Sequence, residues 1–172
     1  MLFRSSVTGE SGQPVPDIER CERIVRDMPN RPKMETSNAA SYRPLTDTVG
    51  MPDKSLFAGS EEYYSTLFHE LGHSTGHPSR VGREGIENVN AFASTSYSKE
   101  ELVAEMTSAF LCAVSGISPA TLSNSVAYLQ GWIRKLRGDS RLLVSAASHA
   151  QKASDYILGK SQASESETEV GN

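Results

Sequence analysis

Apolar side chains recur at intervals of three and four residues along most of this chain, which is the spacing of one face of an α-helix. Two short segments instead have the composition and turn boundaries of β-strands, residues 40–43 and 48–51. The pattern predicts helices over residues 17–28, 60–76, 98–115 and 140–158, and a further one that starts near residue 119 or 123. We therefore expect an α+β fold that is mostly helical and has a small antiparallel sheet.

The second of these helices carries an H-E-x-x-H motif formed by His69, Glu70 and His73. Residues four apart on a helix project from the same face, so the two imidazoles can bind one divalent metal ion. The glutamate between them can reach a water molecule on that ion and act as its general base. We expect Ser60 to cap this helix and Gly76 to end it. The competing interpretation is a helix with two ordinary, partly buried histidines.

A catalytic zinc site requires a third protein ligand besides a water molecule. The next helix, which we expect Ser98 to cap, carries Glu101 and Glu105 four residues apart on one face. One of them can bind the metal while the other accepts a hydrogen bond from the second ring nitrogen of a ligand histidine. Their spacing alone does not say which residue does which. The competing interpretation is that both acids, with Glu100, only solvate the helix.

Three further side chains are candidates for contacting the substrate or stabilising an oxyanion, namely Tyr97, His77 and Arg80. His77 follows the second histidine of the motif by four residues and could imitate a third histidine ligand. Gly76 and Pro78 flank it, however, so we expect the helix to end first and His77 to face a loop or the substrate. For Tyr97 the alternative is simple packing at the entrance of the next helix.

A length of 172 residues suits one domain with one core. Residues 1–16 lack periodicity and residues 161–172 are polar and acidic, so we expect both segments to be disordered around a domain of residues 17–160. The net charge is −4, and most of it comes from the glutamates of the acidic tail. The nearly neutral remainder argues against strong intrinsic binding to nucleic acid.

The two cysteines, Cys21 and Cys112, have neither metal-binding nor redox spacing. The sequence shows no secretory signal and no apolar run of membrane-spanning length. We therefore expect a cytoplasmic protein that does not contact membranes.

Distinctive segments surround the motif and continue over most of the chain. They are PNRP at 29–32, YRP at 42–44, DTVGMP at 47–52, YYSTLFHELGHSTGHPSR at 63–80, EELVAE at 100–105, FLC at 110–112, YLQGWI at 128–133 and AASHAQKA at 146–153. Together with Tyr97 they closely resemble the zincin-like metallopeptidase domain of the ArdC antirestriction family, which also occurs in TraC-type plasmid primases and phage polyvalent proteins. The resemblance covers residues 17–158 and implies a zincin-like metallopeptidase fold.

The resemblance also implies roles for the site residues. In gluzincin metallopeptidases an acid downstream of H-E-x-x-H binds the metal, and the acid four residues later supports a histidine ligand. On that pattern Glu101 joins His69 and His73 as ligands of one Zn²⁺ per chain, and Glu105 supports one of the histidines. The chain is then expected to be a zinc metallopeptidase that hydrolyses peptide bonds with Glu70 as the general base.

Members of that family usually carry an N-terminal domain that binds single-stranded DNA, whereas only residues 1–16 precede the first helix predicted here. We therefore expect DNA contact only through a missing domain or a partner. The expected partners are a peptide or protein substrate, including a restriction or host protein. The alternative function is a non-catalytic antirestriction or protein-binding module that keeps the metal site for structure or docking.

Overall fold

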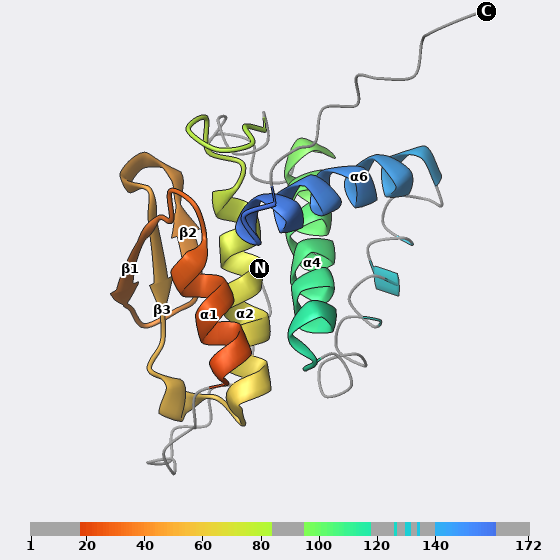
Figure 1. Ribbon diagram of the computed structural model, residues 1–172. Helices are drawn as coiled ribbons and strands as arrows, with labels where there is room; N and C mark the ends of the chain where they lie inside the picture. The colour runs from red at the N-terminus through yellow and green to blue at the C-terminus, as the bar shows by residue number, and fades with distance from the viewer. Residues whose placement is uncertain are drawn as a thin grey trace, which may run out of the picture.

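The computed structural model describes residues 18–83, 95–117 and 140–160, together with residues 126, 130, 131 and 134 (Figure 1). Its helices and strands are α1 (Glu19–Asp27), β1 (Lys33–Thr36), β2 (Ser41–Arg43), β3 (Thr48–Met51), α2 (Ser60–Ser74), α4 (Thr95–Ser115) and α6 (Ser140–Ile157). The expectation of an α+β fold that is mostly helical is confirmed. No helix within these described ranges combines the length and apolar character that crossing a bilayer requires.

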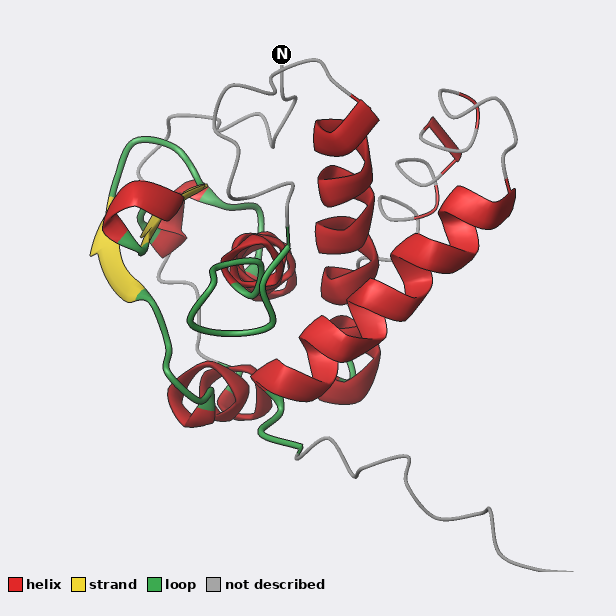
Figure 2. Ribbon diagram, turned by 90° about the horizontal axis from the view of Figure 1, so that it is seen from above, coloured by secondary structure: helices red, strands yellow, loops and turns green. Residues whose placement is uncertain are grey.

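Helix α2 lies in the middle of the fold, between the sheet with α1 on one side and α4 on the other (Figure 1). It packs most extensively against α4, and it also contacts β2, β3 and α6. Helix α6 crosses α4 and covers one end of the arrangement, whereas the sheet stays at one side (Figure 2). Because α2 has neighbours around most of its surface, most of its residues from Tyr64 onward are buried.

The main core gathers apolar side chains from all of these layers. Its buried members are Cys21, Val25, Met28, Val49, Met51, Phe57, Tyr64, Leu67, Phe68, Leu71, Leu111, Cys112, Ile117 and Ile157. A second, smaller cluster between α4 and α6 consists of Leu102, Val103, Ala146 and Ala150. Burial of these side chains, at about 25 cal/mol per Å² of apolar surface, is what fixes α4 and α6 against α2.

The antiparallel pairing expected of residues 40–43 and 48–51 is confirmed, but a third strand makes the sheet mixed. β2 pairs antiparallel with β3, as the turn between residues 44–47 requires, but β1 pairs with the other edge of β3 in parallel. Every residue of β1 is exposed, so its sequence lacks the alternation of apolar and polar side chains that marks a half-buried strand. The pattern of side chains along the sequence therefore did not predict β1.

Several helix boundaries differ from the predicted ones. Gly59 occupies the cap position of α2, and Ser60 is its first helical residue. Helix α4 begins at Thr95, so Ser98 is at an internal position of the helix and not at its N-cap position. Of the helix expected after residue 119 or 123, only single helical positions are described, and the segments expected to be disordered, 1–16 and 161–172, lie outside the described residues.

The turn after α2 is connected to the sheet by a partly buried ion pair. Arg80 donates to both carboxylate oxygens of Asp47, at 2.9 and 2.6 Å, and also to the backbone carbonyls of Asn30 and Ser74. Asp47 adopts a left-handed backbone conformation, with φ of 48°, and accepts a further hydrogen bond from the Tyr42 hydroxyl. The end of α2 is thereby fixed relative to β2 and β3.

Asp47→Asn is expected to lower the free energy of unfolding by about 2 kcal/mol, because the Arg80 side chain is fully buried and loses its charged partner. Urea denaturation in the presence of a chelator measures this effect. Glu35→Gln is the matched control, because the ion pair of Glu35 with Arg43 is about half exposed and should contribute less than about 1 kcal/mol. Equal effects of the two substitutions would contradict a structural role for the ion pair of Asp47 with Arg80.

Helices α2 and α4 approach each other closely at Gly72. A Cβ atom added there would lie 3.2 Å from the Ala104 Cα atom and 3.2 Å from the Thr107 Cβ atom. These distances are shorter than ordinary van der Waals contacts, and one of the atoms belongs to the backbone of α4. A side chain at this position would therefore require the neighbouring atoms of α4 to shift by a few tenths of an ångström.

Gly72→Ala is expected to lower the free energy of unfolding by about 1–2 kcal/mol, since overpacking outweighs the gain in helix propensity. Gly131→Ala is the control, because a Cβ atom at the helical residue Gly131 meets no atom within 4 Å and should be neutral or stabilising. Thermal unfolding of both variants in the metal-free state makes the comparison. Stabilisation by Gly72→Ala would show that α2 and α4 can move apart at this crossing without a loss of stability.

Candidate metal centre

Helix α2 presents both histidines of the motif toward α4. Leu67, Phe68 and Leu71 are buried in the main core, which fixes the rotation of α2 about its axis. His69 and His73 then lie one turn apart on the face toward α4, and they are 2% and 8% exposed. Their Nε2 atoms are 3.0 Å apart. Two ring nitrogens therefore converge on one point inside the protein.

Glu101 of α4 completes this convergence. Its carboxylate oxygens lie 3.3 Å from Nε2 of His73 and 3.8 Å from Nε2 of His69. One donor atom from each of the three residues lies within 4.8 Å of the others. Donors around a tetrahedral ion at bond lengths of about 2.0–2.2 Å are roughly 3.3–3.6 Å apart. The separations of 3.0, 3.3 and 3.8 Å lie around this range, so small shifts of the side chains would place the three donors about one small divalent ion.

The opposite nitrogen of each imidazole faces its own carboxylate. Nδ1 of His69 lies 3.2 Å from Glu105 Oε2, and Nδ1 of His73 lies 3.3 Å from Glu100 Oε1. An ionised carboxylate only accepts hydrogen bonds, so each Nδ1 carries the ring hydrogen. In a neutral imidazole the lone pair is then on Nε2, the atom that faces the point of convergence.

The Nε2 lone pairs of His69 and His73 and the carboxylate of Glu101 would repel one another at these distances, so a cation between them is favoured. A proton on His73 is one such cation. Burial lowers the pKa of His73, but hydrogen bonds with Glu100 and Glu101 and the charge of Glu70 outweigh it and raise this pKa to about 10. A divalent metal ion is the other cation that the donor set suits, since two imidazoles and one carboxylate are typical ligands of catalytic zinc. The surroundings of His73 thus favour positive charge.

Glu70 is buried beside these groups, with 4% of its surface exposed. It follows His69 on α2, and its charge acts on His73. A buried carboxylate next to a metal position is the arrangement that general-base chemistry requires. Its role as the base stays a prediction.

The acids of α4 do not merely solvate the helix, so that interpretation is wrong. Glu100 and Glu101 are 4% and 2% exposed, and the Glu105 side chain is 13% exposed. Glu100 was not selected as a site residue from the sequence, although its carboxylate contacts His73. Arg83 was missed as well, and it makes an ion pair of 2.6 Å with Glu100. Burial raises the pKa of Glu100, but hydrogen bonds with Arg83 and His73 outweigh it and hold this pKa below its usual range.

The three candidates for substrate contact have different positions. Arg80 is committed to Asp47, Asn30 and Ser74 through a guanidinium group that is fully buried, which does not suit an oxyanion ligand. His77 lies in the turn after α2, where its Nδ1 is 2.8 Å from the Ser79 hydroxyl oxygen, and it does not join the converging donors. Tyr97 belongs to α4, but its side chain lies outside the described residues.

Several known proteins are similar to this chain in sequence. The sequence profile of a family described as zincin-like metallopeptidase matches residues 19–149. DNA primase TraC of Escherichia coli is 38% identical over 145 residues, which make up 84% of this chain and 13% of TraC. The uncharacterized protein y4eC of Sinorhizobium fredii is 34% identical over 145 residues, which make up 83% of this chain and 46% of that protein.

Crystal structures of the antirestriction ArdC protein from plasmid R388 have a similar fold. The Mn(II)-bound structure superposes with a TM-score of 0.63 at 33% sequence identity, covering 90% of this chain and 55% of ArdC. The metal-free structure gives a TM-score of 0.60 at 33% identity and covers 88% of this chain and 52% of ArdC. The chain thus spans about half of ArdC and a much smaller share of TraC.

Glu101→Ala is expected to abolish stoichiometric metal binding, because it removes one of three converging donors. Glu105→Ala removes only the acceptor behind His69 and should weaken the affinity by about 10–100-fold. Elemental mass spectrometry of the purified variants, followed by titration of Zn²⁺ against a chelator, compares the two. Equal losses would contradict the assignment of Glu101 as the third ligand, and a larger loss in Glu105→Ala would reassign that ligand to Glu105.

Proposed function

The chain belongs to the zincin-like metallopeptidase family, and on that basis we propose that it is a metal-dependent peptidase. In this proposal His69, His73 and Glu101 hold one divalent ion, and the bound ion supports hydrolysis of a peptide bond. The observation that carries the proposal is the convergence of two Nε2 atoms and one carboxylate, with both Nδ1 atoms turned toward carboxylates.

Zinc is the ion that we propose, at one per chain. Two imidazoles and a carboxylate are common ligands of catalytic zinc, but imidazole and carboxylate also suit other divalent metals. The related ArdC protein has been crystallised with Mn(II). The experiment that identifies the metal is therefore elemental analysis of the protein as purified, without added ions.

Each residue of the site has a distinct task in the proposed reaction. When bound, a divalent ion supplies Lewis acidity for a carbonyl group and makes a water molecule more acidic. Glu70 takes the proton of the attacking water and returns it to the leaving amine. Glu105 and Glu100 keep the two imidazoles in the tautomer that leaves Nε2 as the donor. His77 and Tyr97 remain the candidates for contact with the oxyanion.

A protein-binding module with a structural metal is the alternative. Structural zinc sites are almost always closed by four protein ligands, often including cysteine. Within the described ranges three residues form the cluster, and Cys21 and Cys112 are buried in the main core and not part of it. The donor set therefore favours a site with an open position. The proposed partners are a peptide or protein substrate, including a restriction or host protein. Contact with DNA is proposed only through another domain or a partner.

Glu70→Gln is expected to keep the metal and lose hydrolysis by about 10²–10⁴-fold, because the amide cannot accept the proton of water. A mixture of unstructured peptides incubated with metal-loaded protein and analysed by mass spectrometry measures turnover. Glu101→Ala serves as the comparison that loses both metal and turnover. Undiminished turnover in Glu70→Gln would eliminate Glu70 as the base, and an inert metal-loaded wild type would favour the binding module.

A further inference from the structure

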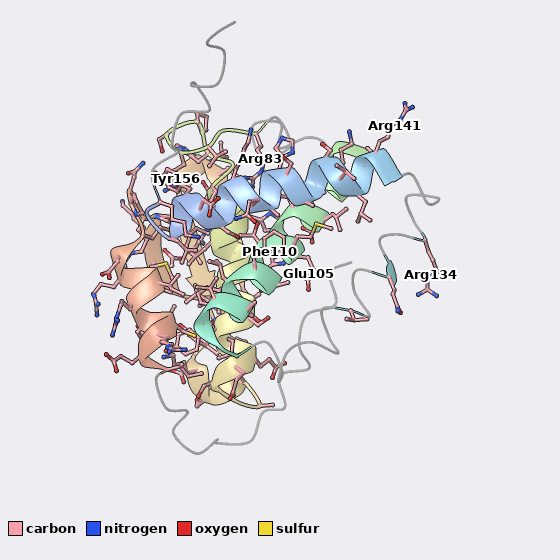
Figure 3. All side chains as sticks on the ribbon, turned by 45° about the vertical axis from the view of Figure 1, so that its right-hand side comes forward. Arg83, Glu105, Phe110, Arg134, Arg141 and Tyr156 are labelled. Carbon is pink, nitrogen blue, oxygen red and sulfur yellow. The ribbon has the colours of Figure 1, made fainter. Side chains whose placement is uncertain are left out.

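Arg83 is a buried arginine next to the candidate metal centre that does not belong to its donor set. It is 8% exposed and lies after the turn that follows α2 (Figure 3). Its Nε donates to Glu100 Oε2 at 2.8 Å, and its Nη2 donates to Glu100 Oε1 at 2.6 Å. Two parallel bonds from a planar guanidinium group fix the plane of a carboxylate, which a lysine ammonium group cannot do.

The same guanidinium group is anchored to the last turn of α2. Nη2 also donates to the backbone carbonyl of Gly72 at 2.8 Å, and Nη1 donates to the Thr75 hydroxyl at 2.6 Å. Gly72 directly precedes His73 in the chain. Arg83 therefore connects the backbone beside one histidine with a carboxylate from α4.

Glu100 passes this constraint to the imidazole. Its Oε1 atom, which accepts from Arg83, also lies 3.3 Å from Nδ1 of His73. From these contacts we propose that Arg83 is a positioning residue, which fixes Glu100 and, through Glu100, aims Nε2 of His73 at the metal. The proposal rests on the proposed function, because it assigns Arg83 a part in holding that metal.

Arg80, three residues before Arg83, is a comparison residue whose role is structural only. Its side chain is fully buried and forms a two-bond pair with Asp47, but its other hydrogen bonds go to backbone carbonyls of Asn30 and Ser74. Neither Asp47 nor Arg80 contacts a histidine of the donor set. If Arg83 acted only as a structural link, substitution of either arginine would lower stability and leave the metal affinity unchanged.

The test is the affinity for Zn²⁺ alone, measured by competition with a fluorescent chelator on variants whose folding is verified by circular dichroism. Arg83→Lys and Glu100→Gln are each expected to weaken binding by about 10–100-fold, the usual range for partners of ligand histidines. The double variant should bind no more weakly than Glu100→Gln, since Arg83 acts through Glu100. Arg80→Lys should lower the melting temperature without changing the affinity.

Thr75→Val provides a milder variant in case Arg83→Lys does not fold. It removes one anchor of the Arg83 guanidinium group at nearly constant shape, and it should weaken zinc binding less than Arg83→Lys. A folded Arg83→Lys or Thr75→Val protein with wild-type affinity would overturn the positioning role. Losses that multiply in the double variant would also overturn it, because Arg83 would then act independently of Glu100.

A second readout does not depend on metal. In the metal-free protein, the ¹⁵N signals of the His73 ring, assigned with a His73→Gln variant, should change in Arg83→Lys and stay unchanged in Arg80→Lys. A wild type that binds no Zn²⁺ but shows this response would overturn the proposed function and support the positioning role. Signals that do not respond to Arg83→Lys would overturn the positioning role whether or not zinc binds.

Discussion

The close contact between α2 and α4 is the constraint on which the rest of the structure depends. Both nitrogen donors come from α2, whereas the three carboxylates that contact the imidazoles, those of Glu100, Glu101 and Glu105, come from α4, so neither helix holds the site alone. The helices lie close together at Gly72, where an added Cβ atom would be 3.2 Å from atoms of Ala104 and Thr107. A wider separation would move every carboxylate away from its imidazole at once, because all three project from the same rigid helix.

Burying so many polar groups is costly unless each has a partner of suitable charge. The histidines meet this requirement with both ring nitrogens, since one faces the converging donors and the other faces Glu105 or Glu100. Arg83 brings a positive charge to the Glu100 end of the cluster. The cluster can therefore remain inside the fold, where the low dielectric strengthens each of these interactions.

The short segment after α2 connects the site with both halves of the fold. Arg80 reaches toward the sheet through Asp47, and three residues later Arg83 reaches toward α4 through Glu100. Each also donates to a backbone carbonyl in the last turn of α2, Ser74 and Gly72 respectively. The carbonyl end of a helix carries partial negative charge, which two arginines suit. The C-terminal end of α2 is thereby connected to the sheet through Arg80 and to α4 through Arg83.

The sequence by itself determined the features that depend on neighbours a few residues apart. The period of apolar positions gave the helices, and the spacing of His69, Glu70 and His73 placed them on one helix face, because helix geometry is local. Only the tertiary structure decided which carboxylate of α4 contacts which imidazole nitrogen. Those contacts depend on how far α4 is rotated and shifted relative to α2. The pairing of Glu100 with Arg83 was not predictable, because the two residues are 17 positions apart and each resembles an ordinary surface charge in the sequence. The parallel pairing of β1 was not predictable either. An exposed strand has no alternation of apolar and polar side chains, and its partner is decided only by the path of the chain.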